Sequence, residues 1–201
     1  EHGPLRLEGA GETVELSVEG AWTQVLRGEA RKKLEREILP AYLQSRSWYA
    51  DGERQLRRIR VAEELPLSLK EGGPLLLILE AEYADDPTVL YILPLTYAAA
   101  AQALDVLEHF KSEVLARLTV DGSWGLLYDG GYSEEVHHLL HGLLLGRRKI
   151  RGRWGELAGR QLPRKQIPDE IRQGFGSSRV LAQSGEQPER GGSSNTSIVL
   201  D

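Results

Sequence analysis

In Pro74-Leu75-Leu76-Leu77-Ile78-Leu79-Glu80-Ala81-Glu82-Tyr83, an apolar run passes into alternating glutamate and apolar residues. This pattern is typical of a β-strand, because successive side chains of a strand point to opposite faces of the sheet. The turn residues Ala84-Asp85-Asp86-Pro87 follow, and a second apolar strand pattern covers 89–95. Two strand patterns joined by a short turn predict an antiparallel β-hairpin.

Further strand patterns lie on both sides of this hairpin. Alternation of apolar and polar residues predicts strands at 13–18, 56–62 and 114–120. Asp121-Gly122-Ser123 separates the last of these from 125–128, which predicts a second hairpin. After residue 151 the apolar periodicity fades, and one short strand is expected near 179–182.

Three segments carry apolar residues at helical spacing. The spacing predicts a helix over 29–39, which Pro40 should end, and further helices over 98–110 and 133–145. Arg147, Arg148 and Lys149 suit the last turn of the third helix. Together with the strands, these helices predict an α+β fold in which an antiparallel sheet packs with two or three helices.

Composition excludes several classes of protein. The 201 residues are 40% hydrophobic and 27% charged, as in an ordinary globular protein, and the net charge of −5 favours neither nucleic acid nor an anionic membrane as a partner. The longest apolar run is far shorter than the roughly 20 residues of a membrane helix. The absence of cysteine excludes disulfides and fits a cytoplasmic protein. The chain also lacks methionine, which suggests that it was excised from a longer one.

The end of the chain holds a candidate phosphate-binding turn, Gly191-Gly192-Ser193-Ser194-Asn195-Thr196-Ser197. Glycines let several backbone N–H groups approach one anion, and hydroxyl groups add donors. No lysine follows as in a Walker A loop, so the same pattern also fits a flexible hairpin tip.

Other polar clusters have simpler interpretations. His137 and His141 share a helix face, as zinc ligands can, but the spacing signals no third ligand, and we interpret them as part of a partly buried helical cluster with His138. The basic residues 147–153 could bind an acidic partner, although a solvated helix end is the commoner case. We interpret Asp129 as a turn residue. The four tryptophans could stack on sugars, but packing in the core is their commoner use. No catalytic residue and no metal ligand can be nominated.

Four segments stand in a recognisable order along the chain. They are Leu39-Pro40-Ala41-Tyr42-Leu43 with Ser45-Arg46-Ser47-Trp48-Tyr49, Leu77-Ile78-Leu79-Glu80-Ala81-Glu82-Tyr83-Ala84-Asp85 with Tyr91-Ile92-Leu93-Pro94-Leu95, Leu115-Ala116-Arg117-Leu118 with Gly125-Leu126-Leu127-Tyr128-Asp129, and Ser194-Asn195-Thr196-Ser197-Ile198-Val199. In this order and spacing they resemble the N-terminal cap domain of maltokinases, followed by the start of the kinase N-lobe.

The resemblance implies an ATP- and Mg²⁺-dependent transfer of phosphate to maltose, giving maltose 1-phosphate, on a bilobal kinase fold. It places Ser194, Asn195, Thr196 and Ser197 in the phosphate loop. The phosphate-binding lysine, the catalytic aspartate and the magnesium-binding aspartate would follow Asp201, so the chain alone should be inactive. Partners would be the remaining kinase lobes of the same protein and a trehalose synthase, since the lead-in over 12–34 resembles the junction of such fusions.

The resemblance also divides the chain into three segments. Residues 1–28 would be a lead-in from an upstream domain, 29–150 the cap domain, and 151–201 a connector with the first N-lobe hairpin. Two alternatives stay open: a non-catalytic binding or regulatory α+β module, and the cap of a glucosamine-type sugar kinase.

Overall fold

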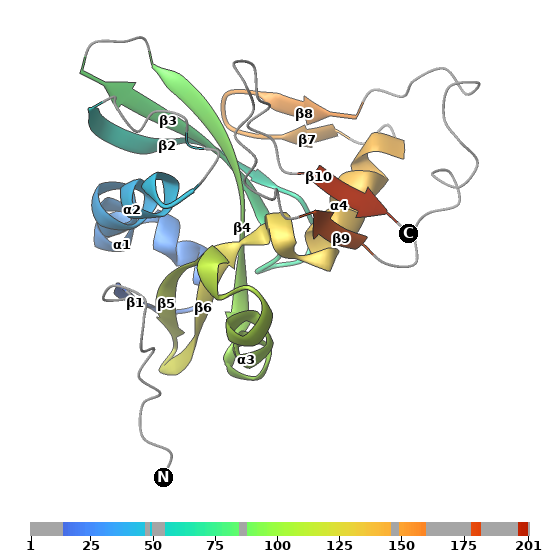
Figure 1. Cartoon of the computed structure of the whole chain (residues 1–201), viewed down its shortest axis with the longest axis horizontal. Coiled ribbons are helices and arrows are strands. Elements are labelled where there is room, and N and C mark those ends of the chain that lie inside the picture. The colour runs from blue at the N-terminus through green and yellow to red at the C-terminus, as the bar shows by residue number, and fades with distance from the viewer. Residues whose placement is uncertain are drawn as a thin grey trace.

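The computed structural model describes residues 14–46, 49, 55–84, 88–145 and 149–159, and the backbone of 178–181 and 197–200. Within these residues the fold is α+β, as predicted: a curled six-stranded sheet packs with helices and is accompanied by two-stranded sheets (Figure 1). None of the helices in these ranges has the length and apolar character that a membrane span requires.

The six-stranded sheet has the order β1-β5-β6-β4-β3-β2. Its strands are β1 (Glu15–Val18), β2 (Leu56–Pro66), β3 (Leu75–Tyr83), β4 (Val89–Ala99), β5 (Val114–Val120) and β6 (Ser123–Asp129). Both predicted hairpins are confirmed, because β3 pairs antiparallel with β4, and β5 with β6. The one parallel pair joins β1 to β5, with Leu16 opposite Leu118. The long chain between these two strands allows such a crossover, whereas a tight turn does not.

One continuous helix lies against the inner face of the sheet. It consists of α1 (Gly28–Lys33), a π-helical turn η2 (Leu34–Ile38) and α2 (Leu39–Gln44). The prediction that Pro40 ends the helix was therefore wrong. In the π turn the Leu39 N–H bonds to the Leu34 carbonyl, five residues back, and Pro40 then occupies the first turn of α2. A missing N–H costs little at such a position.

The main core lies between this helix and the sheet. Alternate residues of β3 (Leu75, Leu77, Leu79 and Ala81) point inward, and Leu34, Ile38, Leu39 and Leu43 of the helix belong to the same buried cluster. Trp22, Val25 and Leu26 of the 3-10 turn η1 (Trp22–Leu26) complete it, and the Trp22 indole donates to the Gly72 carbonyl at 2.6 Å. Burying one such leucine contributes about 1.5–3 kcal/mol, so residues 22–43 are an integral part of this core.

Smaller elements complete the part of the fold that the structure describes. These are α3 (Ala100–His109), η3 (Lys111–Glu113), η4 (Gly130–Tyr132), α4 (Glu134–Leu145), β7 (Lys149–Arg151) and β8 (Glu156–Ala158). Val136 of α4 packs with Leu65, Leu67 and Leu76 in a second buried cluster. Lys149 begins β7 instead of ending the third helix, which corrects that prediction. The short strand expected near 179–182 is β9 (Ser178–Leu181), which pairs antiparallel with β10 (Ser197–Leu200).

Strand β2 is an outer strand of the sheet, and the helix bonds directly to its outer side. Glu35 accepts the Val61 N–H at 2.9 Å, and the Arg31 guanidinium donates to the Val61 carbonyl at 2.7 Å. Arg31 and Glu35 are also paired with each other at 2.9 Å. These two side chains therefore take the place of a neighbouring strand at Val61.

Candidate functional site

The predicted phosphate loop can be placed only through the strand that follows it. Ser194, Asn195 and Thr196 lie outside the described residues, and Ser197 begins β10, where its backbone pairs with Leu181. The antiparallel β9–β10 pair lies beside α4 (Figure 1). A strand that starts directly after 191–196 and pairs with an earlier strand fits the predicted loop, and the role of the loop stays a prediction.

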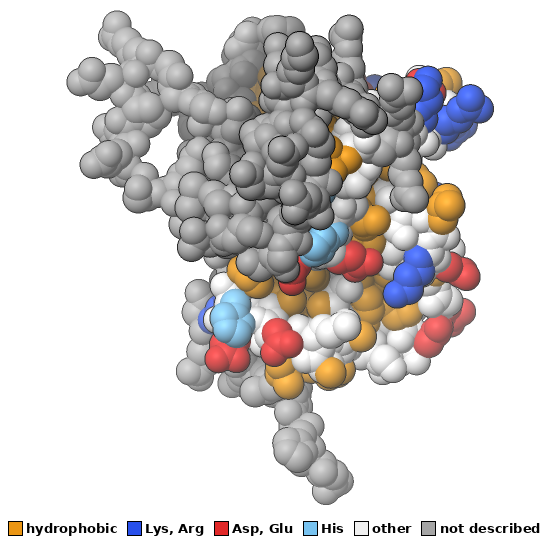
Figure 2. Space-filling view, turned by 90° about the vertical axis from the view of Figure 1, so that its right-hand side faces the viewer, with side chains coloured by type: hydrophobic (Ala, Val, Ile, Leu, Met, Phe, Trp, Pro, Cys, Tyr) orange, Lys and Arg blue, Asp and Glu red, His pale blue; other side chains and the backbone are white. Residues whose placement is uncertain are grey.

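The histidines of α4 do not form a metal centre within the described ranges, where no group of three or more His, Asp or Glu is placed to hold a metal ion. His137 is buried, with its Nε2 2.7 Å from the Gly131 carbonyl. His138 lies 3.9 Å from Glu134 on the surface. On the face shown in Figure 2, histidine side chains are not gathered into one patch.

A buried polar network joins three elements that are distant in sequence. The Tyr42 hydroxyl of α2 donates to Asp129 Oδ2 at the end of β6 at 2.6 Å, and it lies 3.1 Å from Glu113 Oε2 of η3. Arg46 donates to the same Glu113 oxygen at 2.6 Å. The exposed fractions of Tyr42, Glu113 and Asp129 are 5%, 6% and 8%. Four polar groups therefore meet in the interior of the fold.

Contacts with the backbone hold two side chains of this network in place, those of Arg46 and Asp129. Arg46 follows α2, donates to the Ser112 carbonyl at 2.6 Å and stacks its guanidinium 4.6 Å from the centre of the Tyr42 ring. Asp129 accepts the Gly131 N–H at 2.7 Å, which fixes the turn η4. The interpretation of Asp129 as a turn residue is thus correct but incomplete, since its second oxygen binds Tyr42.

Electrostatics favour a structural role for this network. Burial raises the pKa of Asp129, which the hydrogen bonds from Tyr42 and Gly131 only partly offset. Burial and the neighbouring Asp129 also raise the pKa of Tyr42, so that its hydroxyl stays protonated as a donor. Two carboxylates and one guanidinium share the site, and the network ties α2 to β6 and η3.

Sequence reasoning did not identify this network. Glu113 carried no signal, because it is one of 30 acidic residues. Tyr42 and Arg46 appear in the sequence only as parts of the first motif, and Asp129 only as part of the third. Their meeting depends on contacts 71 and 87 residues apart in the chain. The available signal was Asp129, an acidic residue at the end of the apolar segment 125–129.

Replacing Asp129 with asparagine should change how stability depends on pH. The pKa of Asp129 is raised above its ordinary 3.8 in the folded state, so the folded state binds a proton more tightly than the unfolded state. The contribution of Asp129 to stability is therefore largest in acid and is lost as the pH rises through the raised pKa. Asparagine cannot ionise, and its amide oxygen can still accept the Gly131 N–H.

We expect the Asp129→Asn variant to gain stability relative to the wild type as the pH rises from about 4 to 7, as measured by urea unfolding at each pH. A difference that is constant over this range would contradict the assignment.

The fold and the network define a small α+β domain in which a curled sheet packs around one helix. The buried polar network joins the end of this helix to η3 and to the end of β6. The family model of the maltokinase N-terminal cap domain matches residues 42–132. This part of the chain is therefore similar to that cap domain. The match runs from Tyr42 to the end of η4, so it contains all four residues of the network. It falls within the predicted cap segment 29–150, although the boundaries of the three predicted segments stay predictions. No match was found among curated proteins.

Proposed function

We propose that the chain forms the N-terminal cap region of an ATP-dependent maltokinase. Such an enzyme transfers phosphate from ATP to maltose and yields maltose 1-phosphate, a reaction that belongs to trehalose and glycogen metabolism. The observation that carries the proposal is the match of residues 42–132 to the maltokinase cap domain.

The structure supports the proposal through the positions of the motif residues. The first motif supplies Tyr42 and Arg46, and the third supplies Asp129, which bonds to Tyr42. The second motif forms the β3–β4 hairpin. Segments that resemble the family in sequence are thus joined in space by hydrogen bonds and strand pairing, as expected if they were selected as one unit.

In this proposal the cap has a structural role, and the chemistry belongs to other parts of the enzyme. Phosphoryl transfer depends on positioning and on neutralising the phosphate charge, for which Mg²⁺ and a lysine are the usual means. The resemblance puts the lysine, the catalytic aspartate and the magnesium-binding aspartate beyond the loop at 194–197. We therefore propose that ATP and Mg²⁺ bind in the whole enzyme, that a fused or associated trehalose synthase is a partner, and that the protein works in the cytoplasm.

The test compares the 201-residue chain with the longest natural protein that contains it. Both are incubated with ATP, Mg²⁺ and either maltose or glucosamine, and the phosphorylated sugar is identified by ³¹P NMR. We expect maltose 1-phosphate from the longer protein and no product from the shorter chain. Phosphorylation by the short chain, or a preference of the longer protein for glucosamine, would overturn the proposal.

A further inference from the structure

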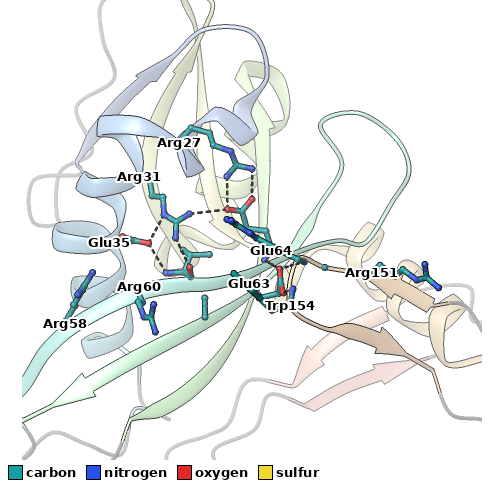
Figure 3. A pocket seen from close by; sticks show the side chains of 13 residues that line it. Arg27, Arg31, Glu35, Arg58, Arg60, Glu63, Glu64, Arg151 and Trp154 are labelled. Carbon is teal, nitrogen blue, oxygen red and sulfur yellow. Dashed lines mark hydrogen bonds and ion pairs between the residues drawn. The ribbon is translucent and has the colours of Figure 1, made fainter.

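A charged groove of about 700 Å³ lies between the helix, strand β2 and the turn that joins β7 to β8 (Figure 3). Its cationic lining consists of Arg27, Arg31, Arg58, Arg60, Arg151 and Arg153. Its acidic lining consists of Glu35, Glu63 and Glu64. Cations thus predominate in this groove, although the whole chain carries a net charge of −5.

Two of the three glutamates are already neutralised. Glu64 accepts two hydrogen bonds from Arg27, at 2.7 and 2.8 Å, and lies 3.6 Å from Arg31. Glu35 accepts from Arg31 at 2.9 Å and also from the Val61 N–H. Figure 3 shows these groups turned toward one another between the helix and β2. Their negative charge is therefore largely compensated on the helix side of the groove.

The third glutamate holds the β7–β8 turn in place. Glu63 accepts the backbone N–H groups of Arg153, at 2.8 Å, and of Trp154. Burial by itself would raise the pKa of Glu63, but these backbone donors outweigh it and lower the pKa. Gly152 lies so close that a Cβ there would come 2.6 Å from the Glu63 carboxyl carbon. Glu63 therefore stays ionised and fixes Arg153 and Trp154 at the edge of the groove.

Two arginines remain without an anionic partner among the described residues. They are Arg58 on β2 and Arg153 on the turn, whereas Arg60 is paired with Glu80 and Arg151 lies 4.0 Å from Glu156. Arg58 and Arg60 are two residues apart on β2, so their side chains belong to the same face of the sheet.

An aromatic side chain stands beside Arg153. Trp154 is 77% exposed, and the Arg153 guanidinium lies 5.1 Å from the centre of its ring. A large aromatic ring held in solvent by a fixed turn offers a flat apolar face next to cationic donors.

We propose that this groove binds a small ligand that carries phosphate groups, with Arg58 and Arg153 binding the phosphate. Guanidinium groups suit this role, because their planar N–H donors match the geometry of phosphate oxygens. Trp154 would stack on a sugar ring or a base attached to the phosphate. The site shares no residue with the predicted phosphate loop at 194–197, and the proposal does not depend on the proposed kinase function.

The test is isothermal titration of the 201-residue chain at low ionic strength with pyrophosphate, glucose 1-phosphate and ATP in separate experiments. We expect saturable binding of pyrophosphate that weakens as salt is added. Arg58→Gln and Arg153→Gln should each reduce the affinity about tenfold, because each removes a charge-assisted hydrogen bond. Arg57→Gln is the matched control: it removes the same charge from the same strand but does not line this groove, so the affinity should stay unchanged.

Trp154→Ala separates the phosphate contact from the stacking contact. If Trp154 stacks on a sugar ring, this variant should bind glucose 1-phosphate more weakly; if it stacks on a base, the variant should bind ATP more weakly. In both cases the binding of pyrophosphate, which has no ring, should stay unchanged. ATP binding that survives both arginine substitutions would belong to another site, such as the predicted loop, and would count against this groove. The proposal is overturned if pyrophosphate does not bind at millimolar concentration, or if Arg57→Gln weakens binding as much as Arg58→Gln does. Thermal unfolding of each variant checks that it is folded.

Discussion

Arg46→Met should lower the free energy of unfolding by about 3–5 kcal/mol, because it leaves Glu113 as an uncompensated charge in the interior. The Arg46 and Glu113 side chains are only 12% and 8% exposed, and their contact is 2.6 Å long. Methionine keeps much of the apolar stem that packs on Tyr42, so the loss of stability comes mainly from removing the positive charge. The free energy of unfolding is measured by urea unfolding, followed by tryptophan fluorescence.

Two further variants make this experiment decisive. Adding Glu113→Gln to Arg46→Met removes the stranded charge and should restore most of the stability. Arg27→Met breaks a bidentate contact with Glu64, but the Arg27 side chain is 58% exposed, so the expected loss is under about 1 kcal/mol. Equal losses for Arg46→Met and Arg27→Met would mean that the network does not hold α2, η3 and β6 together.

Gly125→Ala should destabilise the protein by about 3 kcal/mol, at the upper end of the cost of overpacking. Gly125 lies in β6 between Leu118 of β5 and Ala99 of β4. A Cβ at this position would overlap the Ala98 carbonyl oxygen and the Tyr97 ring. The Tyr97 side chain could move, but the carbonyl belongs to a central strand and cannot move without disturbing the sheet. Thermal unfolding should show the loss.

Gly142→Ala is the matched control for this substitution. Gly142 lies within α4, and a Cβ there would have nothing within 4 Å. Alanine is the better helix former, so this variant should be more stable by up to about 1 kcal/mol. If Gly125→Ala were as stable as Gly142→Ala, this would contradict the inference that β4 lies too close to β6 to admit a side chain at residue 125.

Local sequence patterns were sufficient for the hairpins and most of the helices. Alternation along β3 and the turns before β4 and β6 are local signals, and both hairpins formed as predicted. The helix at 28–44 shows the limit of such signals. Pro40 normally limits a helix, but a single π turn over 34–38 shifts the hydrogen bonds so that the helix continues.

Long-range contacts were beyond these signals. The parallel pairing of β1 with β5 depends on how the whole sheet curls, and no spacing along the chain encodes it. For the same reason the sequence suggested neither the Tyr42–Asp129 bond nor that Arg58 and Arg153 would line one groove. The resemblance to maltokinases identified the segments that matter, but the side-chain partners became visible only in three dimensions.

The bonds from Arg31 and Glu35 to Val61 have a consequence for shortening this protein. A chain cut at residue 42, where the family match begins, would lose α1 and η2. The Val61 N–H and carbonyl would then be open at the edge of β2, beside an uncovered leucine-rich face. Open strand edges of this kind recruit strands from other molecules. Such a chain is expected to self-associate and precipitate. A chain that begins before β1 keeps α1 and η2, whose Arg31 and Glu35 bond to Val61 at the edge of β2.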